Sequence, residues 1–164
     1  MANVVLVESG KAGKDVTGDL QKPIKDLSPA ETWDALSNNK NTALVDVRTA
    51  AEWGFVGIPE LGATGKDPLL VEWRRAPDMS VNPEFANTLL GALGEDVPEQ
   101  LFFLCRSGAR SREAGQYIQN ILSGNGISCE CVNVAEGFEG DLNPQGHRGK
   151  SNGWKARELP WKQS

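Results

Sequence analysis

The chain has 164 residues, of which 39% are hydrophobic and 24% charged, and its formal net charge is −5. This length and composition are typical of one soluble globular domain. The negative charge argues against nucleic acid or an anionic membrane as the main partner, and no apolar stretch approaches the ~20 residues that a membrane span needs.

The first 22 residues are polar and rich in glycine and lysine after a short apolar start. No basic region precedes that apolar start, so the segment does not have the pattern of a secretory signal. We expect a flexible or loosely docked arm over residues 1–22, and a cytoplasmic protein with reduced thiols.

Regular structure is predicted from residue 24 onward. Residues 24–27 are expected to form a short edge strand. Ser28, Pro29 and Glu31 then predict the start of a helix, because serine is a favoured N-cap, proline suits the first turn and Glu31 completes a capping box. Residues 42–47 have the composition of a buried strand.

In residues 49–80 the secondary structure cannot be assigned from the sequence, because glycine and proline interrupt the apolar residues. The second half of the chain is predicted to alternate strands and helices. The expected elements are a helix from 82–84 to about Leu93, a strand at 101–104, a helix after Cys105 that ends near Gly124, and a last strand at 129–134. This alternation predicts an α/β fold, with a parallel sheet of about five strands and helices on both faces.

Cys105 lies between an apolar strand and the start of a helix. Active sites of parallel α/β folds lie at the carboxyl ends of the strands, and Cys105 is at one such end. Four residues separate it from Arg110. A loop this short around a thiol directs its backbone N–H groups toward the sulfur, and these donors, the helix dipole and the arginines all favour the thiolate. The same loop suits an anion held on the sulfur, such as a persulfide.

The run from Cys105 to Ser111, Cys-Arg-Ser-Gly-Ala-Arg-Ser, resembles the active-site loop of rhodanese-like sulfurtransferases. Residues 44–48, Leu-Val-Asp-Val-Arg, followed by Glu52, resemble a second motif of that family, and residues 132–140 resemble its last strand and Gly-rich turn. The resemblance covers about residues 23–142 and implies a rhodanese-like fold.

The resemblance implies a sulfurtransferase that carries sulfane sulfur as a persulfide on Cys105, taking it from a small anionic donor such as thiosulfate and giving it to cyanide, a thiol or a sulfur-accepting protein. No cofactor and no metal are expected. The implied anion-binding loop consists of Arg106, Ser107, Gly108, Ala109 and Arg110.

The two loop arginines are given different roles. Arg106 is expected to project toward the mouth of the site and attract the donor, and Arg110 to brace the loop against an acid, either Asp46 or Glu52. Among the supporting residues Asp46, Arg48 and Ser111, the resemblance implies that Asp46 supports the loop and that Arg48 pairs with Glu52. An ordinary ion pair near the end of the sheet is the alternative for these charged residues.

Two alternatives stay open. A phosphatase or arsenate reductase on the same fold typically has one more residue between cysteine and arginine, so the loop favours sulfur. A persulfide relay or redox-binding module that acts on a partner protein would keep the same loop. The segment after Glu52 lacks the histidine of the family pattern Gly-His-Ile-Pro-Gly-Ala, so the acceptor is not implied.

Three further residues invite a chemical role. The spacing of Cys129 and Cys131 is compatible with a pair of metal ligands or with a resolving thiol. The simpler interpretation is that both are packed strand residues, since a zinc site needs more ligands. His147 is the only histidine, and we interpret it as a loop residue because a persulfide mechanism needs no general base. Three cysteines exclude a full disulfide framework.

The last segment, residues 143–164, extends beyond the domain predicted at residues 23–142. It contains Trp154 and Trp161, whose apolar surfaces predict docking on this domain or on a second copy, as in a homodimer. The expected contact is the region from Phe55 to Trp73.

Overall fold

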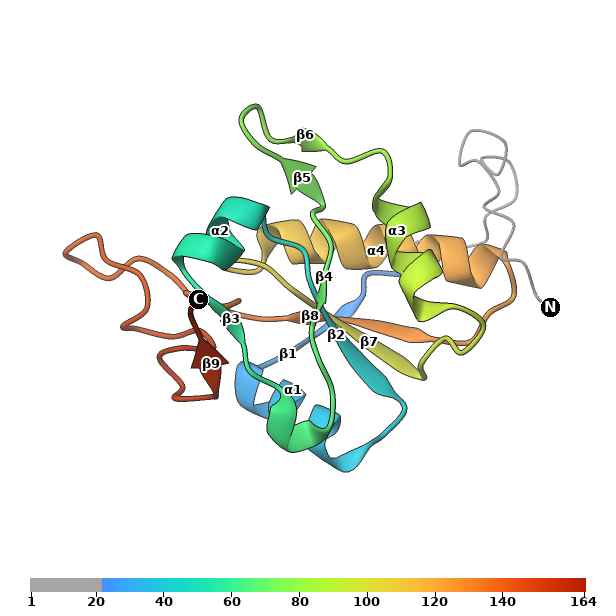
Figure 1. The fold of residues 1–164 in the computed structure, drawn as a ribbon, viewed down its shortest axis with the longest axis horizontal. Coiled ribbons are helices and arrows are strands. Elements are labelled where there is room, and N and C mark those ends of the chain that lie inside the picture. The colour runs from blue at the N-terminus through green and yellow to red at the C-terminus, as the bar shows by residue number, and fades with distance from the viewer. Residues whose placement is uncertain (1–21) are drawn as a thin grey trace.

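The structure is a computed structural model that describes residues 22–164, with a five-stranded sheet at its centre. The strand order is β1-β8-β7-β2-β4, and all neighbouring strands are parallel (Figure 1). The bounds are β1 Lys25–Leu27, β2 Thr42–Asp46, β4 Leu69–Leu70, β7 Gln100–Leu104 and β8 Glu130–Val134. The predicted α/β fold with a parallel sheet of about five strands is confirmed.

Helices cover both faces of this sheet (Figure 1). Helix α1 (Pro29–Asn38) lies on one face, and α3 (Phe85–Leu93) and α4 (Ala109–Gly124) lie on the other. Helix α1 begins with the predicted capping box, in which Ser28 Oγ accepts from the Glu31 backbone and Glu31 Oε1 accepts from the Ser28 backbone.

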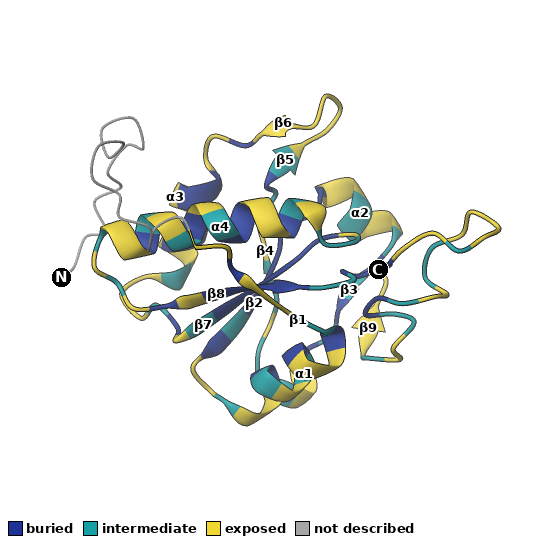
Figure 2. Cartoon of the chain, turned by 180° about the vertical axis from the view of Figure 1, so that it is seen from behind, coloured by how far each residue is buried: buried dark blue, intermediate teal, exposed yellow. Residues whose placement is uncertain are grey.

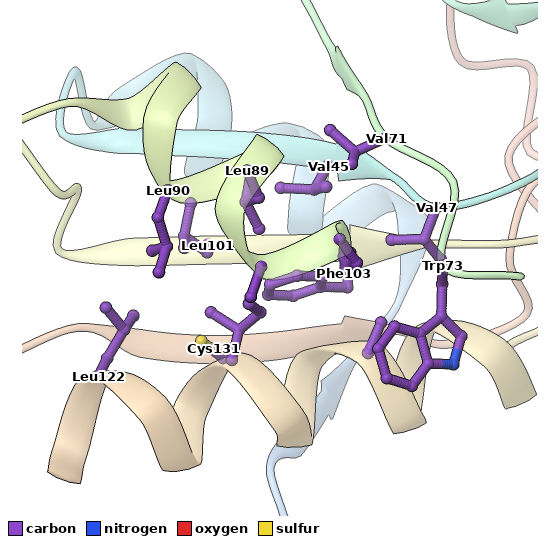
Figure 3. Packing of buried hydrophobic residues seen from close by; sticks show 14 of the residues in the cluster. Val45, Val47, Val71, Trp73, Leu89, Leu90, Leu101, Phe103, Leu122 and Cys131 are labelled. Atoms are coloured by element: carbon purple, nitrogen blue, oxygen red, sulfur yellow. The ribbon is translucent and has the colours of Figure 1, made fainter. Parts of the chain in front are cut away.

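Each face of the sheet packs its own apolar cluster, so the central strands β8, β7 and β2 are buried on both sides, whereas the edge strands β1 and β4 are partly exposed (Figure 2). The cluster under α3 and α4 includes Leu101, Phe103, Leu122 and Cys131 (Figure 3). The cluster under α1 includes Leu36 of that helix and, from β7, Phe102 and Leu104. Within residues 22–164, no helix is long and apolar enough to cross a membrane.

Residues 49 to about 80, for which the sequence indicated no clear helices or strands, form very short elements. They are α2 (Ala50–Phe55), β3 (Ile58–Pro59), the 3-10 turn η2 (Gly62–Thr64), β4, β5 (Arg74–Arg75) and β6 (Ser80–Val81). Strands β5 and β6 form an antiparallel hairpin away from the main sheet (Figure 1). Two-residue strands leave no periodicity in the sequence, which explains why they were missed.

The C-terminal segment packs against the α1 face. Trp154 is 0% exposed and its ring meets Trp33 edge-on, with centroids 6.1 Å apart. Strand β9 (Trp161–Lys162) pairs antiparallel with β3, so this segment contacts the region after Phe55. The division into an arm, a domain and an extension stays a prediction, and residues 1–21 of the arm lie outside the described residues.

We predict that Trp154→Ala destabilises the fold by roughly 3–5 kcal/mol, because it leaves a cavity between α1 and the sheet. Trp161→Ala is the matched control, because that ring is 37% exposed and loses less packing. Urea denaturation measures both. Equal losses of unfolding free energy in the two variants would contradict the prediction.

Candidate active site

Cys105 directly follows β7, in the middle of the sheet between β2 and β8. Its side chain is buried, and among the described residues its sulfur meets two donors: the Gly108 backbone N–H and the Ser111 hydroxyl, each 3.1 Å away. Gly108 is the N-cap of α4 and has a φ of 113°, a conformation that suits glycine. The sulfur therefore lies at a helix N-terminus, where negative charge is favoured.

The remaining loop residues divide by exposure. Arg106 and Ala109 are exposed, whereas Ser107, Gly108 and Arg110 are half-buried. The exposed position of Arg106 is consistent with its expected role, which is to attract an anionic sulfur donor to the site. Within residues 22–164, the Gly108 N–H is the group of the predicted anion-binding loop that hydrogen-bonds to the sulfur, whereas the Arg110 guanidinium bonds to Glu52.

Arg110 pairs with Glu52, one of the two acids predicted for it. Its Nη1 and Nη2 donate to Glu52 Oε1 and Oε2 at 2.7 and 2.9 Å, which joins α4 to α2. Burial alone would raise the pKa of Glu52, but hydrogen bonds and charge from Arg110, with a further bond from Thr49, lower it below its usual value. Both side chains are mostly buried, so the pair is shielded from solvent.

Arg48 does not pair with Glu52, and that prediction is wrong. Its Nε and Nη2 donate to the Asp46 carboxylate at 2.9 and 2.6 Å, and Nη2 also donates to the Gly57 carbonyl at 2.8 Å. Glu52 forms its ion pair with Arg110 instead. The buried Arg48 guanidinium also lies 4.2 Å above the centre of the Phe138 ring. Asp46 and Arg48 therefore tie the end of β2 to the segments around it.

A turn at residues 136–140 supports the other side of the Cys105 loop. The Cys105 carbonyl accepts from the Phe138 N–H at 2.8 Å, and the Arg106 carbonyl accepts from Glu139 and Gly140 at 3.0 and 3.1 Å. Gly137 has a φ of 67°, and a Cβ there would lie 2.5 Å from the Arg106 carbonyl oxygen. Only glycine permits this approach.

Two residues of the site were not predicted from the sequence: Asn133 and Asp26. Asn133 is buried in β8 and its Oδ1 lies 2.6 Å from the Ser111 hydroxyl oxygen. Its Nδ2 donates to Asp26 Oδ1 at 2.9 Å. The available signal was a polar residue between Val132 and Val134 in a strand expected to be buried.

The other candidate residues lie apart from this sulfur. Cys131 pairs in register with Leu101, at the opposite end of β7 from Cys105, and both Cys129 and Cys131 are buried in the apolar cluster under α3 and α4. The backbone of His147 bonds to Asn143 in the C-terminal segment. No group of three or more potential metal-binding side chains occurs in the described part of the chain.

A parallel sheet in the order β1-β8-β7-β2-β4, with a cysteine loop between its central strand and a helix, defines a rhodanese-like domain. No protein-family model matches the chain. It is 40% identical to Rv0390 from M. tuberculosis, whose crystal structure superposes with a TM-score of 0.75 over 87% of this chain and 100% of that one. An uncharacterized protein of Rickettsia rickettsii is 36% identical over 84% of this chain and 97% of its own length. The chain belongs to the family of these two proteins.

More distant structures share the fold alone. The polysulfide-sulfur transferase homodimer of Wolinella succinogenes has a TM-score of 0.54 and 20% identity, covering 89% of this chain and 83% of that one. The As-Sb reductase of Leishmania major has a TM-score of 0.53 and 14% identity, covering 76% and 91%. The fold therefore occurs both in a sulfur transferase and in a reductase.

We predict that Arg110→Gln lowers the unfolding free energy by roughly 2–3 kcal/mol, because it leaves the Glu52 carboxylate without its main partner. Arg106→Gln, at an exposed position of the same loop, should change stability little. Denaturation of both variants at neutral pH measures the difference.

The pH dependence of that loss provides a control. Since folding lowers the pKa of Glu52, its contribution is fully present above the unfolded value of 4.5 and disappears as pH falls through the folded value. The stability gap between the native chain and Arg110→Gln should therefore narrow in acid. A gap that stays constant would show that Glu52 is not the group responsible.

Proposed function

We propose that this protein is a sulfurtransferase that carries sulfane sulfur on Cys105. The Cys105 thiolate attacks the outer sulfur of a small anionic donor such as thiosulfate, a new S–S bond forms, and sulfite leaves with the electron pair of the broken bond. An acceptor thiolate or cyanide then attacks the outer sulfur of the persulfide. The Cys105 thiolate is released and the cycle closes.

The position of the Cys105 sulfur carries this proposal. It lies at the N-terminus of α4 with the Gly108 N–H 3.1 Å away, in a loop that supplies one exposed cation, Arg106. These features stabilise a negatively charged sulfur without a general base. The motif resemblance to sulfurtransferases points to the same chemistry.

Loop size argues against phosphoryl or arsenate chemistry. Four residues lie between Cys105 and Arg110, and Arg110 is held by Glu52 rather than directed toward the sulfur. A transferring phosphoryl group spreads its charge over three equatorial oxygens, which need more donors than this loop provides. A reductase or phosphatase is therefore the less favoured activity.

A protein acceptor would make the chain one member of a persulfide relay. Phe55 on α2 is 85% exposed, and α2 is joined to the site through Glu52 and Arg110. A relay and a free enzyme share the loading step and differ only in the acceptor. Transfer of labelled sulfur to cyanide and to candidate proteins, measured side by side, separates them.

We predict that Cys105→Ser abolishes thiosulfate:cyanide activity while the fold is kept, because the hydroxyl is not ionised at neutral pH. Mass spectrometry after incubation with thiosulfate should find one added sulfur on Cys105. Cys129→Ser, in the apolar cluster, is the control and should still load sulfur. Sulfur found on Cys129 or Cys131, or aryl phosphate turnover that Cys105→Ser removes, would overturn the assignment.

A second prediction concerns Arg106. Replacing it with glutamine should raise the KM for thiosulfate several-fold with a smaller effect on kcat, because an exposed cation attracts the anion before it contributes to bond formation. The effect should shrink at high salt, which screens such attraction. An unchanged KM with a lower kcat would assign Arg106 to the transfer step instead.

A further inference from the structure

A chain of hydrogen bonds leads from the candidate nucleophile to the protein surface. Ser111 Oγ lies 3.1 Å from the Cys105 sulfur and 2.6 Å from Asn133 Oδ1. The Asn133 amide donates to Asp26 Oδ1 at 2.9 Å, and Arg112 donates to both Asp26 oxygens at 2.7 Å. Ser111 and Asn133 are almost fully buried, so water does not compete with the contacts among Cys105, Ser111 and Asn133.

The Ser111 hydroxyl has one hydrogen and two acceptors within reach. It can donate to Asn133 Oδ1 or to the Cys105 sulfur, but not to both. If Cys105 is ionised, a bond from Ser111 to the sulfur leaves two oxygens facing each other at 2.6 Å without a hydrogen between them. If the Ser111 hydroxyl keeps donating to Asn133 Oδ1, the thiolate loses a donor. The two acceptors therefore compete.

Asp26 decides which atom of the Asn133 amide faces Ser111. Turning the amide over would place its oxygen against the Asp26 carboxylate, 2.9 Å from Oδ1 where the nitrogen now lies. Burial raises the pKa of Asp26, but hydrogen bonds from Arg112 and Asn133 outweigh it and lower the pKa below its usual value. The carboxylate thus remains an acceptor, and the Asn133 oxygen keeps facing Ser111.

We propose that Asn133, oriented by Asp26, is a positioning residue that draws the Ser111 hydrogen away from the Cys105 sulfur. The thiolate is then stabilised less, which leaves it a stronger nucleophile toward a donor and a poorer leaving group. In the persulfide the inner sulfur carries no charge and needs no donor from Ser111. The network therefore favours the loaded form of the protein over the free thiolate.

This inference rests on the proposed function only in taking Cys105 as the nucleophile, and its test needs no sulfur transfer. The readout is the ultraviolet absorbance of the thiolate at a fixed pH at which Cys105 is partly ionised. Each variant is compared with the same variant carrying Cys105→Ser, which removes the contributions of the other cysteines and the tyrosine.

Asn133→Leu keeps the approximate side-chain volume and removes the acceptor, so Ser111 is free to donate to sulfur. The ratio of thiolate to thiol should rise roughly tenfold, as expected for one hydrogen bond to a charged group. In a Ser111→Ala background the same substitution should change nothing. An unchanged or lower ratio, or an equal rise with and without Ser111, overturns the proposal.

Asp26→Asn tests the orientation without a change in the core, because Asp26 is partly exposed. An asparagine there can face either side of the Asn133 amide, so the orientation is released and the thiolate ratio should also rise. Ser111→Ala should abolish that rise, whereas a rise that survives comes from lost charge alone and overturns the proposal. Arg112→Gln keeps Asp26 in place and should not raise the ratio. Failure of the native chain to transfer sulfur would overturn the proposed function and leave these results standing.

Discussion

Three backbone hydrogen bonds, from residues 138–140 to the carbonyls of Cys105 and Arg106, fix the loop on which the candidate site depends. They fix the first two peptide groups of the loop, which limits the directions in which the chain can enter α4. The turn approaches the Cys105 loop so closely that Gly137 has no room for a Cβ. The conformation of the turn and that of the loop therefore depend on each other.

Two arginine–carboxylate pairs, Arg48 with Asp46 and Arg110 with Glu52, complete this support. Arg48 and Asp46 are fully buried, and their desolvation is offset by two hydrogen bonds between their side chains, one from the Arg48 backbone to Asp46, one from Arg48 to Gly57, and the ring of Phe138. The net stability of such a pair is small, but removal of one partner leaves a buried charge. The pair therefore specifies one arrangement of the strand end more than it stabilises the fold. Arg110 and Glu52 do the same between α2 and α4.

Local features were predictable from the sequence, and long-range pairings only in part: Glu52 was one of two acids expected for Arg110, and the C-terminal segment contacts the region expected for it. The capping box of Ser28 and Glu31 spans three residues, and the loop after Cys105 is continuous, so both could be predicted. The partner of Arg48 was predicted wrongly because Asp46 and Glu52 are both within four positions, and only the placement of α2 selects between them. The contact of Ser111 with Asn133 depends on the packing of α4 on β8. Strand β9 pairs with β3 across about a hundred residues, and no pattern within either segment indicates it.

The C-terminal segment bonds to the turn that holds the loop. The Trp154 backbone N–H donates to the Gly137 carbonyl and the Gly153 backbone N–H to the Glu136 carboxylate, both at 2.8 Å. Ribosomes synthesise residues 153 and 154 after every strand of the main sheet, and after Cys105 itself. A nascent chain can therefore assemble its sheet before its thiol loop is braced, so the surroundings of the Cys105 sulfur can be completed only after the C-terminal segment has docked.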